Sequence, residues 1–273
     1  MKTRVITAAV LVPLLLAVLY AAPKIVTVIL FSLLGAFSAI ELLYNTGLVK
    51  HFRLVIYTVI TAALVPVWCY FGMGKAWALA LILLFAVLLF MEAMLSGMKI
   101  RFEKISTCLA AGLLIPFLLS SLVRIITPDG GRYYILIPFV VAFLSDTGAY
   151  FIGCRFGRHK LAPLISPKKS VEGVFGGVAF AAIGMLLYLL VMKSFFNASV
   201  NYGYALVYGI LGSAIGVFGD LCFSVIKRQT GIKDYGNLFP GHGGVLDRFD
   251  SMLLVSPLIE LLLEILPVMV VPV

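Results

Sequence analysis

Residues Ser224–Asp250 read SVIKRQTGIKDYGNLFPGHGGVLDRFD and concentrate charge in a chain that is otherwise apolar. The stretch holds three of the twelve acidic residues, four cations and one of the three histidines, and Asp220 lies just before it. Apolar segments flank it on both sides. Charge this dense beside membrane-like segments indicates a site for phosphates and metal ions.

The composition of the 273-residue chain is that of a membrane protein. It is 62% hydrophobic and 12% charged, with a mean hydropathy of +1.12, whereas soluble domains carry about 25% charged residues. The apolar runs are too continuous for the alternating strands of a barrel. We therefore predict an all-α polytopic protein of about nine transmembrane helices. The expected helices are 5–22, 25–44, 54–71, 76–95, 105–126, 133–152, 171–192, 204–226 and 252–272.

Two common alternatives for such a chain are not indicated. The first apolar run follows Lys2 and Arg4, but no cleavage site with a hydrophilic mature region comes after it, so we expect a retained helix. The four cysteines lack the spacing of metal ligands, and neither a disulfide framework nor a zinc site is predicted.

The positive charges predict the orientation. With the N-terminus in the cytoplasm, sixteen of the 21 Lys and Arg residues fall on the cytoplasmic side. The long polar loops 153–170 and 227–251 then lie on that side together. The net charge of +9 is a topology signal and gives no reason to expect nucleic-acid binding. We expect residues 1–104 to be scaffold or lipid-facing helices, and residues 105–273 to form the catalytic membrane region.

Four aspartates in the C-terminal half are candidate metal ligands. Asp220 and Asp146 lie in apolar segments, where an ionised carboxylate needs a cation or polar cavity. Asp247 and Asp250 are three residues apart and share a helix face. Mg²⁺ prefers carboxylates and phosphate oxygens, and Arg248 between them suits a phosphate. Helix capping and salt bridges are the structural alternatives for these five residues.

Two loops carry candidate phosphate ligands. The run Pro240–Gly244 contains three glycines, which let backbone N–H groups approach an anion, and His242 suits a phosphate contact or proton transfer. A flexible turn is the alternative. Upstream, Lys168, Lys169 and Ser170 precede the expected start of a helix, where anions bind readily.

The residues of both regions resemble the phosphatidate cytidylyltransferases (CDP-diacylglycerol synthases). The resemblance rests on S-x-x-K-R-x₄-K-D-x-G-x₃-P-G-H-G-G-x-x-D-R-x-D, occupied by Ser224–Asp250, and on Asp146–Tyr150 with Ser166–Gly173. It implies the reaction of CTP with phosphatidic acid to CDP-diacylglycerol and pyrophosphate, with Mg²⁺ and room for a second monovalent or divalent cation. It also implies a bacterial inner or organelle membrane, a site facing the cytoplasm, and leaves a homodimer open.

The matching positions also imply roles for individual residues. The implied metal ligands are Asp220 and Asp247, followed by Asp250 and Asp146. The implied catalytic residues are Asp220, Asp247, Arg248, Lys227 and His242. The implied substrate-binding residues are Lys168, Lys169, Ser170, Ser224, Arg228, Lys233, Gly243 and Gly244.

Two other functions are compatible with parts of the pattern. A CTP-dependent kinase of a polyprenol or phytol would transfer the γ-phosphate and need a base for the alcohol, which gives His242 more weight. An ion-coupled transporter would use Asp146, Asp220 and Glu172 as coupling carboxylates. Transporters usually contain internal repeats, and the sequence shows none.

Overall fold

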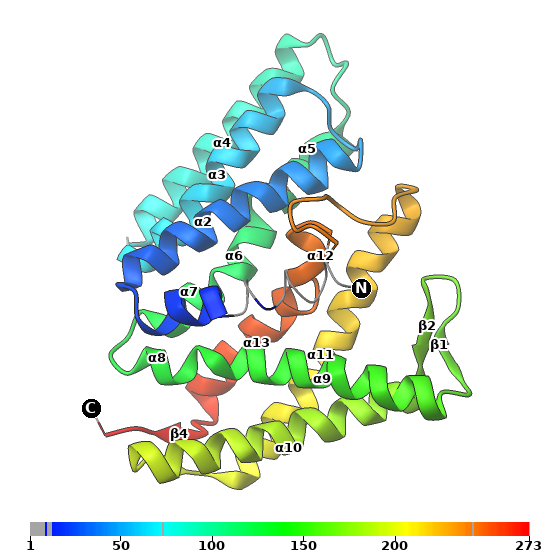
Figure 1. Cartoon of the computed structure of the whole chain (residues 1–273). Helices are drawn as coiled ribbons and strands as arrows, with labels where there is room; N and C mark the ends of the chain where they lie inside the picture. Colours follow the sequence, from blue (N-terminus) through cyan, green and yellow to red (C-terminus); the bar gives the residue numbers. More distant parts are fainter. Residues whose placement is uncertain (1–8, 10–12, 73, 242, 273) are drawn as a thin grey trace. The chain divides into compact units, whose positions relative to one another are not determined.

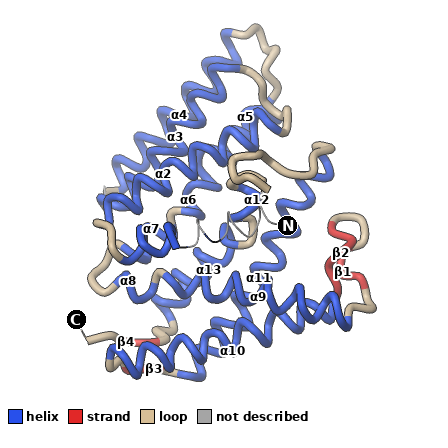
Figure 2. Tube along the Cα trace, in the orientation of Figure 1, coloured by secondary structure: helices blue, strands red, loops and turns tan. Residues whose placement is uncertain are grey.

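The described part of the chain is mainly helical, as the computed structural model shows (Figure 2). It describes every residue except 1–8, 10–12, 73, 242 and 273. Within the described residues, the strands form two small two-stranded antiparallel sheets. The prediction of an all-α polytopic membrane protein is confirmed.

Seven helical segments among the described residues are long and apolar enough to cross a membrane. They are Lys24–Asn45, Phe52–Phe71, Lys75–Leu95, Phe102–Ile126, Gly131–Phe156, Val171–Phe196 and Tyr202–Gln229. Each corresponds to one of the expected helices. Residues 5–8 and 10–12 of the expected helix 5–22 lie outside the described residues, and 13–20 is helical.

The expected final helix 252–272 is shorter than predicted. Helix α13 covers Met252–Ile265, about 21 Å of rise, against a hydrocarbon core of about 30 Å. Pro267 explains the end, because a residue before proline is disfavoured in the helical region. Leu266 indeed leaves it, with φ −136° and ψ 69°. The count of nine spans stays a prediction.

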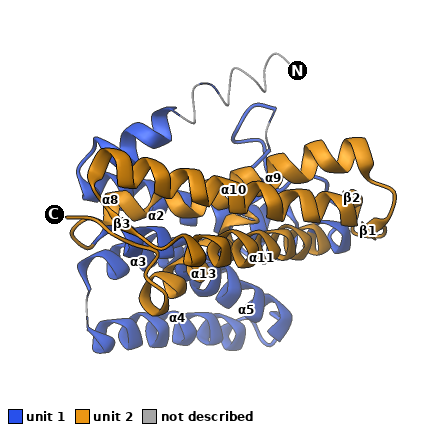
Figure 3. Cartoon of the chain, turned by 90° about the horizontal axis from the view of Figure 1, so that it is seen from below, with its two compact units in different colours: residues 1–127, 227–249 blue, residues 128–226, 250–273 orange. Residues whose placement is uncertain are grey.

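The chain divides into two compact units, coloured separately in Figure 3. Unit 1 contains residues 1–127 and 227–249, and unit 2 contains residues 128–226 and 250–273. The predicted division by role at residue 104 is a different boundary and stays a prediction. The candidate site residues are therefore described separately for each unit.

Unit 1 is a set of packed apolar helices (Figure 1). Helix α2 continues without a break into the π-helical turn η1. Close packing of α2 on α3 is possible because Gly35 has no side chain. A Cβ there would lie 2.9 Å from the Ala62 carbonyl oxygen. The elements are α2 Lys24–Ile40, η1 Glu41–Asn45, α3 Phe52–Phe71, α4 Lys75–Leu95, α5 Phe102–Leu109, η2 Ala110–Leu114, α6 Ile115–Leu119, α7 Ser121–Ile126 and α12 Leu246–Phe249.

Unit 2 is built on the helix pair α9 and α10, which lie side by side (Figure 1). Their backbones touch at Gly148 and Gly176, where a Cβ on Gly148 would lie 2.6 Å from the Gly176 carbonyl oxygen. Small residues allow such close approach in membrane helix pairs. The elements are α8 Gly131–Tyr134, α9 Leu136–Phe156, β1 Lys160–Ala162, β2 Ser166–Ser170, α10 Val171–Phe196, β3 Ser199–Val200, α11 Tyr202–Gln229, α13 Met252–Ile265 and β4 Met269–Val270. The last three residues of α11 belong to unit 1.

The loop expected at 153–170 has more structure than predicted. Helix α9 continues to Phe156, and β1 and β2 form an antiparallel hairpin that leads into α10. Glu172 fastens the hairpin, because its carboxylate accepts hydrogen bonds from the Arg158 and His159 N–H groups and lies 2.6 Å from His159 Nδ1. These contacts of Glu172 are therefore structural.

The predicted orientation can be tested at the two ends of α10. Leu164 in the hairpin is 92% exposed, and Ser194 is exposed near the other end of the helix. On a cysteine-free background, Leu164→Cys should react with an impermeant maleimide from the cytoplasmic side only, and Ser194→Cys from the opposite side only. Asn237→Cys should match Leu164→Cys. Labelling of positions 164 and 237 from opposite sides would contradict the predicted topology.

Candidate functional site

The carboxylate of Asp247, in unit 1, is held by three hydrogen-bond contacts. It lies in the short helix α12 and is only 7% exposed. Its Oδ1 is 3.0 Å from Lys227 Nζ, and its Oδ2 accepts hydrogen bonds from the N–H groups of Tyr235 (2.7 Å) and Gly244 (3.0 Å). A carboxylate offers about four lone-pair sites. The contacts with these described residues use three of those sites.

Both N–H donors to this carboxylate come from the segment 235–246, here called the glycine loop. Phe239 donates its N–H to the Gly243 carbonyl oxygen at 2.9 Å and closes a tight turn. Gly243 has φ +88°, and a Cβ there would lie 2.8 Å from Asp247 Oδ2. Both the backbone conformation and the space thus require glycine. His242, a predicted catalytic residue, lies outside the described residues.

A second buried carboxylate, that of Glu41, holds the far end of the glycine loop. Glu41 is 4% exposed at the start of η1. Its two oxygens accept the N–H groups of Val245 and Leu246, each at 2.9 Å. No functional role for Glu41 was predicted from the sequence. The sequence signal for a role of Glu41 was its position as an acid within an apolar segment. Its partners are backbone N–H groups, which a sequence pattern does not identify.

Asp220 is the corresponding acid of unit 2. It lies on α11, where Oδ2 forms an ion pair with Lys169 and Oδ1 accepts the Ser224 hydroxyl at 3.3 Å. The side chains of Asp220 and Lys169 are 28% and 23% exposed, so both remain accessible to a ligand. Lys169, which the sequence assigned to substrate binding, thus meets a predicted metal ligand directly.

The backbone of Asp250 packs against the same turn of α11. A Cβ on Gly219, the neighbour of Asp220, would lie 2.9 Å from the Asp250 carbonyl oxygen. The Asp250 carboxylate accepts the N–H of Ser251 at 2.8 Å. The backbone of Asp250 therefore lies close to that of the residue before Asp220, and the metal-binding role of both acids stays a prediction.

The other predicted residues differ in their exposure. Ser170 is buried and caps α10, because its hydroxyl accepts the Gly173 N–H at 3.2 Å. The side chains that remain exposed are those of Asp146, Lys168, Arg228, Lys233 and Arg248. Exposed cations suit phosphate binding, and their assigned roles stay predictions.

The described residues contain no cluster of three or more His, Cys, Asp or Glu side chains that could hold a metal. This does not argue against Mg²⁺, which is usually bound by one or two protein carboxylates together with waters and substrate phosphates. Asp220 and Asp247 supply carboxylates of that kind, each beside a lysine. The donor chemistry therefore fits Mg²⁺.

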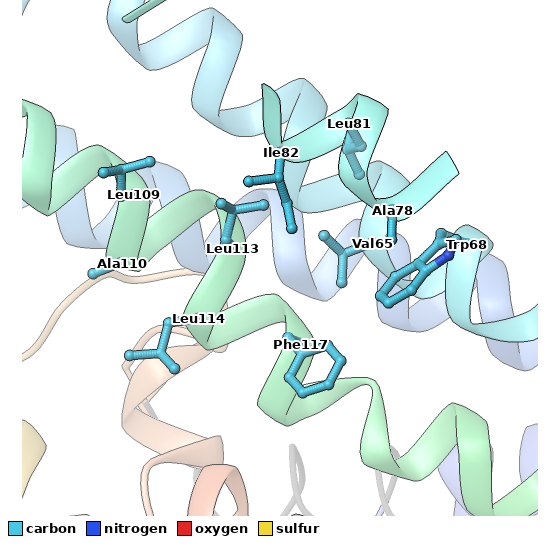
Figure 4. Close-up of a pocket in the computed structure, with 10 residues that line it drawn as sticks. All are labelled: Val65, Trp68, Ala78, Leu81, Ile82, Leu109, Ala110, Leu113, Leu114 and Phe117. Carbon is cyan, nitrogen blue, oxygen red and sulfur yellow. The ribbon is translucent and has the colours of Figure 1, made fainter. Parts of the chain in front are cut away.

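A cavity in unit 1 has the opposite character. It has a volume of about 550 Å³ and is lined by apolar side chains of α3, α4, α5, η2 and α6, among them Trp68, Ile82 and Phe117 (Figure 4). Its lining includes no charged residue. Phosphate groups need cations or N–H donors, so this cavity is unsuited to the polar part of an anionic substrate.

A family model and individual relatives both indicate one family for this chain. A family model described as "Cytidylyltransferase family" matches residues 2–266. The chain is 36% identical to the phosphatidate cytidylyltransferase of Staphylococcus saprophyticus over 96% of this chain and 99% of that protein. It is 46% identical to the protein of that name from Staphylococcus epidermidis, over 50% of this chain and 51% of that protein. The chain thus spans about half the length of the first curated relatives it matches.

The adjacent lysines Lys168 and Lys169 provide a matched test of the unit 2 ion pair. Lys169→Met should lower the melting temperature of the purified protein, because it leaves the Asp220 carboxylate without its cation. Lys168→Met removes an exposed charge and should change the melting temperature much less. Equal effects of the two substitutions, measured by thermal unfolding in one detergent, would contradict a specific role of the pair.

Proposed function

Because the chain belongs to the cytidylyltransferase family, we propose that it transfers the cytidylyl group of CTP to phosphatidic acid. The products are CDP-diacylglycerol, a precursor in phospholipid synthesis, and pyrophosphate. The observation that carries the proposal is the alignment with the Staphylococcus saprophyticus phosphatidate cytidylyltransferase, which extends over 96% of this chain and 99% of that protein.

The chemistry of the reaction suits the residues that the units present. A phosphate oxygen of phosphatidic acid attacks the α-phosphorus of CTP and forms a new P–O bond. The bond from the α-phosphorus to the oxygen that bridges to the β-phosphorus breaks, and pyrophosphate leaves with its electron pair. A phosphate monoester loses its second proton at a pH of about 6, so the nucleophile is already ionised and no protein base is needed.

The main obstacle is electrostatic, because both substrates are anions. Lys227 and Lys169, each within reach of a carboxylate, supply positive charge that can turn to a phosphate oxygen. Arg248, Arg228 and Lys233 add exposed cations in the Ser224–Asp250 stretch. Fixed positive groups aimed at the charge that develops on the transferred phosphate lower the barrier.

Mg²⁺ is the proposed cofactor, with Asp220 and Asp247 as its main ligands and Asp250 and Asp146 as further candidates. When bound, the ion neutralises phosphate charge and makes the α-phosphorus a better electrophile. A second cation, monovalent or divalent, stays part of the proposal. The protein itself holds the two carboxylates in place. Hydrogen bonds from Tyr235 and Gly244 hold that of Asp247, and one from Ser224 holds that of Asp220.

The location of the enzyme is proposed from its relatives and from its charge pattern. The two relatives described above are bacterial proteins, which favours the cytoplasmic membrane of a bacterium. With the predicted orientation, the polar loops face the cytoplasm, where CTP is available. Phosphatidic acid reaches the site from the bilayer. Assembly as a homodimer stays open to measurement.

The products distinguish this function from that of a CTP-dependent lipid kinase. Purified protein should be incubated with phosphatidic acid or, separately, with a polyprenol, together with CTP labelled at either the α- or the γ-phosphorus. We expect α label in the lipid product and γ label in pyrophosphate, released in equal amounts. Transfer of γ label to a polyprenol would instead indicate a kinase, and no nucleotide turnover with either lipid would contradict both enzymes.

Two matched aspartate variants complete this experiment. Asp247→Asn should abolish turnover while the protein stays folded, because the amide keeps the shape but loses the negative charge. Asp129→Asn changes an exposed acid outside both motif regions and should leave turnover near wild type.

A further inference from the structure

We propose that Glu41 and Asn45 are positioning residues for the reaction, because they fasten both ends of the glycine loop and thereby fix the carboxylate of Asp247. Both residues belong to the π-helical turn η1 at the end of α2, in the part of the chain that sequence analysis assigned to scaffold. The inference rests on the proposed function, since it assumes that Asp247 takes part in catalysis.

The two side chains contact opposite ends of the glycine loop. Asn45 donates its amide N–H to the Tyr235 carbonyl oxygen at 2.8 Å. Glu41 accepts the N–H groups of Val245 and Leu246 at 2.9 Å each. Figure 1 shows this loop, in orange, beside α2, in blue. One helical turn therefore fixes the first residue and the last two residues of the loop.

The shape of the loop is matched to Glu41. A Cβ on Gly236 would lie 2.7 Å from Glu41 Oε1, and a Cβ on Gly244 would lie 2.3 Å from the same atom. No side chain fits at either position without displacing the carboxylate. The glycines at 236 and 244 thus make room for a protein carboxylate. From the sequence, Gly244 was expected to approach a substrate phosphate.

The contacts reach Asp247 through the backbone. Leu246, which Glu41 holds by its N–H, is the residue directly before Asp247, and Gly244 donates its own N–H to Asp247 Oδ2. Tyr235, which Asn45 holds by its carbonyl, donates its N–H to the same oxygen. Both backbone donors to Asp247 are therefore in contact with η1. Tyr235 is hydrogen-bonded to Asn45, and Gly244 packs against Glu41.

The π-helical turn is consistent with such a role. A π turn contains one residue more than an α turn and is rare, and such turns occur frequently at functional sites. Here it ends the membrane helix with Glu41 and Asn45 both turned to the glycine loop. A carboxylate as buried as that of Glu41 would be costly without hydrogen bonds, and the two loop N–H groups supply them.

The test compares Glu41→Gln with Glu92→Gln. Glu92 is a matched control, because it is also a buried glutamate of a unit 1 membrane helix, 7% exposed, but its partners are Arg53 at 3.4 Å and His51 at 3.7 Å. Glu41→Gln should lower kcat by about tenfold or more and raise the Mg²⁺ concentration needed for half-maximal rate, with little change in KM for phosphatidic acid. Glu92→Gln should leave kcat and the Mg²⁺ requirement within about twofold of wild type.

A milder variant and a second readout keep the test decisive. Asn45→Ala removes one hydrogen bond and should act in the same direction as Glu41→Gln but less strongly. Hydrogen exchange of the peptide covering 235–246 should quicken in Glu41→Gln and stay unchanged in Glu92→Gln, whether or not the protein is active. If wild-type protein forms no CDP-diacylglycerol, the proposed function fails, and exchange alone then decides the positioning role.

Three results would overturn the inference. The first is wild-type kcat and Mg²⁺ dependence in Glu41→Gln. The second is an equal loss of kcat in the two glutamine variants. The third is unchanged exchange of the glycine loop in Glu41→Gln.

Discussion

An ionised carboxylate inside an apolar helical protein needs a cation or hydrogen-bond donors, and the candidate site is organised by that need. Asp247 has Lys227 and two peptide N–H groups. Asp220 has Lys169 and the Ser224 hydroxyl. Glu41 has two peptide N–H groups of the glycine loop. The glycine loop meets this need in unit 1, because the N–H groups of Tyr235 and Gly244 donate to Asp247 and those of Val245 and Leu246 donate to Glu41.

The same contacts suit the two anionic substrates of the proposed reaction. A lysine that neutralises an aspartate in the absence of ligand is already close to where a phosphate and a metal ion would bind. Exchange of partners, with the cation turning to phosphate and the carboxylate to Mg²⁺, would keep each charge paired throughout. Groups that are fixed before the reaction need little rearrangement during it, which is the main source of electrostatic catalysis. This exchange is the central claim of the proposed mechanism.

Much of the fold could be predicted from the sequence, because long apolar runs have few alternatives in a membrane. Seven expected helices correspond to described spans, and Pro267 accounts for the early end of α13. The hairpin at 160–170 was not predicted, since its strands are short, polar and without alternation. The sequence pattern did indicate Lys227 and Asp247 as members of one stretch, and the structure joins them.

The contacts that sequence analysis missed are long-range ones. Lys169 and Asp220 are 51 positions apart and were assigned to different ligands, whereas the structure pairs them. Glu41 is 204 positions from Val245, and its partners are peptide groups, which every residue carries. Only the fold can indicate which peptide groups a buried acid will meet. The glycines at 236 and 244 were visible in the sequence, but the carboxylate for which they make room was not.

The most direct test of the central claim measures the binding of Mn²⁺, as a substitute for Mg²⁺, to purified protein without substrates. Binding is detected as the loss of the free-ion signal in electron paramagnetic resonance. Both ions favour carboxylate oxygens. If Lys227 holds the place of a metal beside Asp247, Lys227→Met should bind Mn²⁺ more tightly than wild type, and Asp247→Asn should bind it more weakly. Unchanged affinity in Asp247→Asn, or weaker binding in Lys227→Met, would contradict the exchange of partners.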